Sequence, residues 1–145
     1  MFFLETFDLG VETTAVTDIL DLTESVQEQV QQTGVTAGLL TLFISGSTAA
    51  LTTIEYESGA VHDLKVAIER LFPQDLDYAH DRRWGDGNGY AHVRAAFLKP
   101  SLSIPIDQGR LQLGTWQQIV LLDFDNRPRQ RQIHGQVLGF TPANG

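Results

Sequence analysis

Residue types that can bind a ligand are concentrated in the segment Trp84–Arg94, which reads WGDGNGYAHVR. Asp86 and Asn88 alternate with glycines that free the backbone to turn, and His92 follows on what reads as the start of a strand. His80 lies a short loop upstream, in the sequence YAHD. The segment predicts a site on a loop held by a rigid sheet. The alternative is an ordinary turn with two incidental histidines.

A second acidic motif lies earlier in the chain, where Glu55 and Glu57 flank Tyr56. In an extended strand, residues two apart point to the same face, so the two carboxylates would be neighbours. When two carboxylates lie close together, the pKa of one of them is raised, which suits a general acid or base. Alternatively, the pair can bind a cation. The alternative is an exposed acidic strand face.

Hydroxyl groups and backbone amides occur together in the predicted turn Gly46-Ser47-Thr48. Ser47 and Thr48 could bind a substrate through their hydroxyls, and the turn could offer N–H groups to an anion. No lysine follows, so this is not a phosphate-binding loop of the GxxxxGK type. The chain also lacks the GxSxG elbow of serine hydrolases.

Two arginines, Arg129 and Arg131, share one face of the last predicted strand because they are two residues apart. Paired guanidinium groups could bind a diphosphate bidentately. The alternative is a solvated strand edge.

Two further side chains of the sequence LGTWQ could contact a ligand. Trp116 could form an aromatic wall for a flat heterocycle, although a core anchor is favoured, and Gln117 could hydrogen-bond a ligand or a neighbouring subunit. His62, within a helical pattern, and His134, within a strand pattern, are interpreted as structural.

The elements that must position these residues are mainly strands with two helices, and no internal repeat is found. One helix is predicted over about 24–32, capped by Asp21 or Thr23, and a second begins at a Ser58 cap and ends before Pro73. A long polar loop follows over 74–88. Short turns join the later strands, so we expect antiparallel pairing. Strands are predicted over 2–17, 36–45, 51–56, 90–98, 101–106, 111–113, 117–125 and 129–140.

Composition bounds the class of protein. The chain has 145 residues and 42% hydrophobic content, which fits one globular domain over 1–145. The net charge of −8 argues against nucleic-acid binding, yet all 10 Lys and Arg lie from Lys65 onward, so a local positive site for a small phosphorylated molecule is predicted. No membrane span or signal peptide is recognised, and cysteine is absent. We therefore expect a cytoplasmic protein.

Five segments in order resemble the YjbQ family, whose members are named secondary thiamine-phosphate synthases or left uncharacterised. The resemblance covers nearly the whole chain. It implies an α+β fold, a mostly antiparallel β-sheet sandwich or partly open barrel, assembled as a homotrimer. The segments are GSTAALTTIEYE (46–57), YAH (78–80), DGNGYAH (86–92), LGTWQQIVLLDFD (113–125) and RPRQR (127–131).

Two positions depart from the family pattern. Many relatives read HTTA where this chain has Gly46-Ser47-Thr48-Ala49, and NGHAH where this chain has Tyr90. An all-histidine metal centre therefore cannot be carried over. The predicted cofactor is a divalent metal ion, zinc or magnesium. Imidazole with carboxylate suits zinc, whereas magnesium prefers the oxygens alone. The ligands left to hold it are His80, His92, Asp86 and Glu55.

The resemblance implies a synthase that joins a hydroxymethylpyrimidine diphosphate to a thiazole phosphate and releases pyrophosphate. Glu55, Asp86 and His92 would then be catalytic. The alternatives are a metal-dependent phosphate-ester hydrolase and a non-catalytic metal- or metabolite-binding trimer. The residues predicted to bind the substrate are Ser47, Thr48, Asn88, Trp116, Gln117, Arg129 and Arg131.

Overall fold

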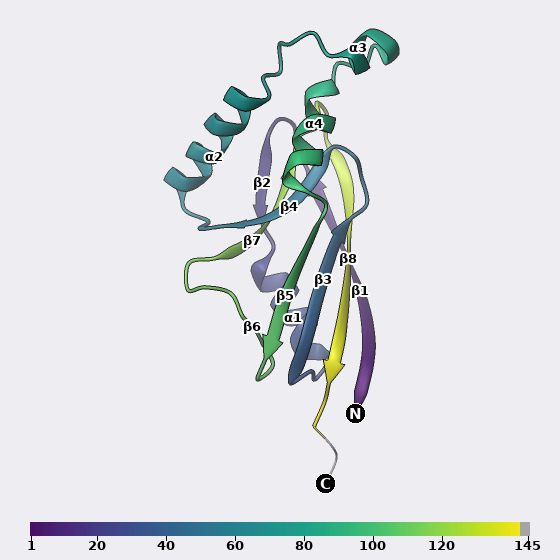
Figure 1. The fold of residues 1–145 in the computed structure, drawn as a ribbon, viewed down its shortest axis with the longest axis vertical. Helices are drawn as coiled ribbons and strands as arrows, with labels where there is room; N and C mark the ends of the chain where they lie inside the picture. Colours follow the sequence, from purple (N-terminus) through teal and green to yellow (C-terminus); the bar gives the residue numbers. More distant parts are fainter. Residues whose placement is uncertain (143–145) are drawn as a thin grey trace.

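The computed structural model of the protein describes residues 1–142 and shows an α+β fold in which antiparallel sheets form a half-barrel (Figure 1). A five-stranded sheet has the order β1-β8-β3-β5-β6, and a three-stranded sheet has the order β2-β7-β4. The predicted fold class and the antiparallel pairing are therefore confirmed. The strands are β1 (Phe2–Thr13), β2 (Asp18–Asp21), β3 (Ala37–Ile44), β4 (Ala49–Ile54), β5 (Ser101–Asp107), β6 (Arg110–Leu111), β7 (Gln118–Asp123) and β8 (Arg129–Phe140).

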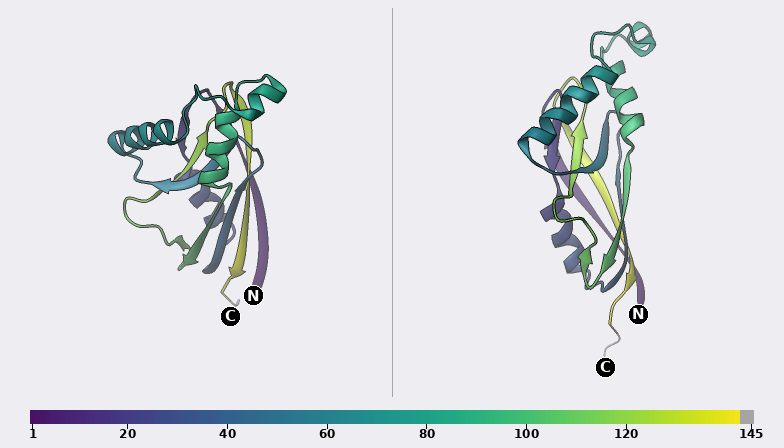
Figure 2. Two further views of the ribbon diagram at one scale, coloured as in Figure 1. Left: turned by 45° about the horizontal axis from the view of Figure 1, so that its top comes forward. Right: turned by 60° about the vertical axis from the view of Figure 1, so that its left-hand side comes forward.

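Four helices, rather than the predicted two, accompany the sheets. They are α1 (Thr23–Gln32), α2 (Ser58–Leu71), α3 (Ala79–Trp84) and α4 (Gly89–Leu98). Helix α1 lies against the five-stranded sheet at the end where both termini lie, and α3 and α4 lie at the other end (Figures 1 and 2). The pocket described below is at the α3–α4 end.

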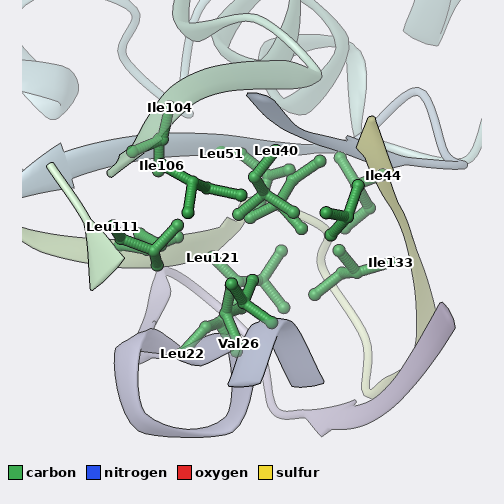
Figure 3. Close-up of a cluster of buried hydrophobic side chains, with 14 of the residues drawn as sticks. Leu22, Val26, Leu40, Ile44, Leu51, Ile104, Ile106, Leu111, Leu121 and Ile133 are labelled. Carbon is green, nitrogen blue, oxygen red and sulfur yellow. The ribbon is translucent and has the colours of Figure 1, made fainter. Parts of the chain in front are cut away.

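The larger hydrophobic core fills the space between the two sheets and α1 (Figure 3). Strand β8 alternates buried and exposed residues, so Ile133 and Val137 enter this core while His134 and Leu138 face outward. Strand β7 is buried on both faces. Ile119 and Leu121 join the larger core, and Val120 and Leu122 pack with α2 and α4 in a second one. The three-stranded sheet is therefore the middle layer.

The outer face of the five-stranded sheet is different. In the views of Figure 2, no helix or strand of residues 1–142 covers it. Its strands nevertheless carry large apolar residues on this side, including Phe2, Leu138 and Phe140.

The prediction of a strand over 90–98 is wrong, because this segment is α4. Its buried residues Tyr90, Ala91, Arg94 and Ala95 follow helical spacing and pack against the three-stranded sheet. The predicted 74–88 loop also contains the short helix α3, which ends at Gly85 with a positive φ of 73°. Two site histidines are therefore on helices, not on a strand and a loop.

The predicted helix caps are also wrong. Helix α2 is capped by Glu57, whose carboxylate accepts hydrogen bonds from the Gly59 and Ala60 amides, and Ser58 is its first helical residue. The N-cap of α1 is Leu22, which has no side chain able to cap, while Asp21 accepts from the Thr23 amide. At α2 a carboxylate therefore caps the helix in place of the predicted hydroxyl.

Within residues 1–142, none of the helices combines the length and the apolar character that crossing a bilayer would require.

Candidate functional site

A pocket of about 460 Å³ opens at the end of the molecule where α3 and α4 meet the sheets. The β3–β4 turn forms one side, α3 and the loop after it form another, and the start of β8 lies beneath. Most of the predicted site residues are brought together here. The lining residues are Gly46, Ser47, Thr48, His80, Trp84, Asp86, Asn88, His92, Arg129 and Arg131.

The wall of the pocket, which we define as His80, Asp86, Asn88 and His92, comes from α3, α4 and the loop between them. The His80 and His92 rings lie with their centroids 4.3 Å apart. The Nδ1 atom of His80 is 3.3 Å from an Asp86 oxygen and 3.7 Å from an Asp81 oxygen. His80, Asp81 and Asp86 are the one set of potential metal ligands that gathers within 4.8 Å in the described part of the chain. His92, which the sequence predicts as a ligand, is not in this set and lies beside it through its contact with the His80 ring.

The short loop between the helices holds this arrangement. Asp81 accepts a hydrogen bond of 2.8 Å from the Gly89 amide at the start of α4, which ties α3 to α4. A Cβ atom at position 89 would lie 2.6 Å from the Tyr78 side chain, so only glycine allows this close contact. One helical turn further, His92 then faces His80.

The wall retains polar atoms without partners. His80 Nδ1 is buried and makes no hydrogen bond, despite the carboxylates nearby. Burial lowers the pKa of His92, the positive charge that His80 can carry lowers it further, and the surrounding aspartates oppose both effects. His92 is therefore a neutral imidazole at neutral pH, with a lone pair for a metal ion or a proton.

The floor of the pocket, which we define as Asp123, Asp125, Arg129 and Arg131, comes from the end of β7 and the start of β8. Both aspartates are fully buried. Arg131 donates to both oxygens of Asp123, at 2.7 and 2.9 Å, and Arg129 donates to Asp125 at 2.8 Å. Buried carboxylates need such partners, because an unpaired charge away from water is costly.

The carboxylate of Asp125 accepts hydrogen bonds from four donor groups. Burial raises its pKa, but hydrogen bonds from the Asn88 amide, the Asn126 backbone, the Thr48 hydroxyl and Arg129 outweigh burial. Its pKa is lowered to about 2. Asp125 is therefore an anion that holds the floor, the β3–β4 turn and α4 together.

Asn88 connects the wall to the floor. Because Asp125 is ionised and can only accept, the Asn88 group 3.2 Å from it must be the NH₂. The carbonyl oxygen of Asn88 is then left buried without a partner. Its position among the pocket residues makes it a second unsatisfied acceptor, besides His80 Nδ1.

The two arginines are not the free pair that the sequence predicts. Arg131 is 8% exposed and is held by Asp123 and Thr48. Arg129 is 33% exposed and keeps part of its guanidinium free of Asp125. A Cβ atom at Gly46 would lie 2.7 Å from Arg131 Nη1, so this arginine lies against the backbone of the turn. Arg129 is thus the better placed of the two for an anion.

Three predicted site residues lie outside this pocket. Strand β4 ends at Ile54, and Glu55 follows in the exposed link to α2, apart from the His80 cluster. Gln117 is bonded to Gly114 and Thr53. Trp116 is 70% exposed, so the favoured interpretation of it as a core anchor is wrong. The tryptophan at the pocket is Trp84.

The shared strand face predicted for Glu55 and Glu57 is also wrong, because Glu57 caps α2. His62 and His134 lie outside the pocket.

Sequence reasoning assigned no role to Asp81, Trp84, Asp123 or Asp125. The signal for the last two was present in the segment LLDFD, where acids interrupt an apolar strand at a spacing of two. An acid in a strand buried on both faces must have a cationic or hydrogen-bonding partner. The partners Arg129 and Arg131 follow at the start of the next strand, in the segment RPRQR.

Comparisons with known proteins agree with the fold and the motifs. The sequence profile of the family described as "UPF0047 protein YjbQ-like" matches residues 7–140, so the chain belongs to this family. A UPF0047 protein from Archaeoglobus fulgidus is 36% identical over 126 residues, covering 87% of this chain and 95% of the relative. One from Synechocystis is 38% identical over 116 residues, covering 79% and 78%.

Solved structures show the same fold. A hypothetical protein from Aeropyrum pernix is 32% identical with a TM-score of 0.87, covering 94% of this chain and 99% of its own. A "YbjQ-like protein of unknown function" from Sulfolobus solfataricus is 27% identical with a TM-score of 0.86, covering 95% and 100%. The resemblance to the YjbQ family is therefore confirmed at the level of sequence and fold.

Proposed function

We propose that the pocket binds a divalent metal ion through His80, His92 and Asp86 and uses it to act on a small phosphorylated molecule. The observation that carries this proposal is the buried Nδ1 of His80, which has no hydrogen-bond partner although it lies 3.3 Å from Asp86. A cation between these atoms would satisfy the nitrogen and neutralise the carboxylate. The donor set of nitrogens and carboxylate oxygens fits zinc or manganese better than magnesium.

The remaining pocket residues suit a phosphate group. Arg129 is anchored by Asp125 on one side, so its direction is set while its other N–H groups stay available. Ser47 offers an exposed hydroxyl beside it. The Thr48 hydroxyl is used by Asp125 and Arg131, so Thr48 positions the floor rather than the substrate.

The reaction we propose is the condensation that the family resemblance implies, joining a pyrimidine diphosphate to a thiazole phosphate. A bound divalent ion supplies charge neutralisation for the departing diphosphate. Arg129 would bind that diphosphate, and Trp84, 68% exposed at the rim, offers a flat apolar surface to a heterocycle. Asn88 would accept a hydrogen bond from the substrate through its unpaired oxygen.

A second candidate reaction, phosphate-ester hydrolysis, is favoured by the state of His92. Burial lowers the pKa of this imidazole, so it is uncharged at neutral pH. In this alternative His92 would not ligate the metal ion but would accept a proton from an attacking water beside the phosphate that Arg129 binds. The same residues would also support binding without turnover.

The test separates cation binding from chemistry. Equilibrium dialysis of the native protein against zinc or manganese should show binding that His80→Ala and His92→Ala abolish. His62→Ala, a histidine exposed on α2, is the matched control and should bind normally. No binding by the native protein would overturn the proposal.

Turnover is then measured with both thiamine precursors and, separately, with p-nitrophenyl phosphate, each with the bound metal supplied. Formation of thiamine phosphate supports the synthase, and release of nitrophenol supports the hydrolase. Cation binding without either product would leave the chain as a metal-binding protein.

We also propose that the chain assembles as a homotrimer through the apolar end of its uncovered sheet face. Phe2 lies opposite Phe140, and Leu138 lies opposite both Leu4 and Leu39, on adjacent strands. These five side chains are 40–58% exposed. Monomers seldom leave so continuous an apolar patch in water.

Light scattering at micromolar concentration should therefore give the mass of a trimer, and Leu138→Lys should give a monomer. Leu76→Lys, at an isolated leucine that is 55% exposed, should leave the trimer intact. A monomeric native protein would contradict this proposal.

A further inference from the structure

On the uncovered face of the five-stranded sheet, three side chains form a hydrogen-bonded chain that the pocket does not use. Asp8 on β1 lies directly opposite His134 on β8, and its carboxylate is 2.6 Å from His134 Nδ1. His134 Nε2 is 2.9 Å from the hydroxyl of Ser45, which follows β3. An acid, an imidazole and a serine are thus joined in the order of a hydrolytic triad.

The chemistry of these groups determines where the protons lie. An ionised carboxylate only accepts hydrogen bonds, so His134 Nδ1 must carry the proton that Asp8 receives. In the neutral ring Nε2 is then an acceptor, and the hydrogen bond from Ser45 must run from its hydroxyl to this nitrogen. This is the arrangement in which an imidazole can take the serine proton when the oxygen attacks.

We propose that Ser45, His134 and Asp8 form a second, nucleophilic site that reacts with small apolar esters. Phe43 lies on the same face opposite His134 and is 45% exposed, which provides apolar surface beside the nucleophile for an acyl group. The Gly46 and Ser47 amides follow Ser45 directly, and no hydrogen bond from either to another described residue is found. As the next backbone N–H groups along the chain, they are the candidates to donate to the developing oxyanion.

The reaction balances within these groups and water. Ser45 Oγ bonds to the ester carbonyl carbon while His134 Nε2 takes the hydroxyl proton. The bond to the alcohol oxygen then breaks, and His134 returns the proton to the departing alcohol. Water attacks the acyl-Ser45 ester in the second step and gives a proton to His134. The bond from the acyl carbon to Ser45 Oγ then breaks, His134 returns the proton to Oγ, and the carboxylic acid leaves.

The site is separate from the proposed self-association patch. Along β8, Leu138 and Phe140 lie four and six residues from His134, which is about 13 and 20 Å in an extended strand. The triad therefore lies toward the other end of the face, and it can be tested in the native assembly.

To test this proposal, the native protein is treated with diisopropyl fluorophosphate and, separately, with p-nitrophenyl acetate. We expect Ser45 Oγ to displace fluoride and carry a diisopropylphosphoryl group, located by mass spectrometry of peptides, and we expect p-nitrophenyl acetate to release nitrophenolate. Ser45→Ala should remove both, and His134→Ala should slow them by about 100-fold, which is the usual contribution of a general base. Asp8→Asn should also slow both reactions, because the carboxylate that orients the His134 ring is then missing.

Ser103→Ala is the matched control, because Ser103 is an exposed serine on the same face, on β5, without a histidine partner among the described residues. It should react like the native protein. Circular dichroism shows whether each variant is folded. A native protein that is not labelled, or labelling that persists in a folded Ser45→Ala variant, would overturn the proposal and leave the three residues as a cross-strand network. Neither outcome depends on metal binding at the pocket.

Discussion

The floor of the pocket is carried by strands β7 and β8, whereas the wall is carried by α3, α4 and the loop between them. In the floor, each buried aspartate is matched by an arginine at 2.7–2.9 Å. In the wall, His80 Nδ1 and the Asn88 carbonyl oxygen are buried without partners. Charges that satisfy one another hold a structure, and atoms left unsatisfied are available to a ligand.

This difference separates the residues that shape the pocket from those that act in it. Arg131 resembles a binding residue in the sequence, but Asp123 and Thr48 use most of its donors. His80 belongs to a loop that sequence reasoning leaves irregular, yet its nitrogen is the one without a partner. Stability should therefore depend on the floor, and ligand binding should depend on the wall.

The largest effect on stability is expected from breaking the Arg131–Asp123 pair. Removing one partner of a buried ion pair leaves an uncompensated charge, which costs about 3–5 kcal/mol. Urea unfolding of Arg131→Ala should show a loss of this size. The double variant Arg131→Ala with Asp123→Ala should lose less than the sum of the single variants, because it leaves neither charge unpaired. Additive losses would show that the two residues act independently.

A smaller, pH-dependent effect is expected from Asp125. Its pKa is about 2 in the folded chain against an ordinary 3.8. The unfolded state therefore takes up a proton at higher pH than the folded state. The stabilisation, about 2 kcal/mol, is complete above the ordinary pKa and is lost as pH falls toward 2.

The stability difference between the native protein and Asp125→Asn, measured by urea unfolding at several pH values, should accordingly shrink over that interval. Asp63→Asn, at an exposed carboxylate of α2 without a side-chain partner among the described residues, serves as the matched control. A constant difference for Asp125→Asn would mean that its hydrogen bonds do not favour the anion.

Strands β3 and β8 could be predicted well from the sequence. Alternation along 129–140 and 36–45 predicts β8 and β3 because each strand has one buried and one exposed face. The family motifs also predicted that His80, Asp86 and His92 would belong to one site, and the structure brings them into one pocket.

The sequence failed where tertiary packing decides the outcome. Helix α4 has a recognisable helical spacing of buried residues only if Arg94 is counted among them. Because a charged residue is expected to be exposed, the sequence alone conceals the pattern of Tyr90, Ala91, Arg94 and Ala95. Glu55 was placed in the site by its motif, but β4 ends one residue earlier. Neither the end of a strand nor the burial of an arginine can be derived from local spacing, because both depend on partners distant in the chain.

The smallest effect on stability is expected in the wall, at His92. Burial lowers the pKa of this imidazole, so near its ordinary pKa the unfolded chain binds more protons than the folded one. Stability therefore rises with pH through that region, and part of it is lost when the pH falls below the ordinary value.

His92→Gln removes the titrating group but keeps a polar side chain of similar reach. Its free energy of unfolding at neutral pH should lie within about 0.5 kcal/mol of the native value, as for most substitutions outside a core. Its stability should also change less than that of the native protein between mildly acidic and neutral pH, whereas His62→Gln should follow the native curve. Urea titrations at the two pH values measure both quantities. A large loss at neutral pH would place His92 with the floor, as a structural residue, and would remove the distinction between the two regions.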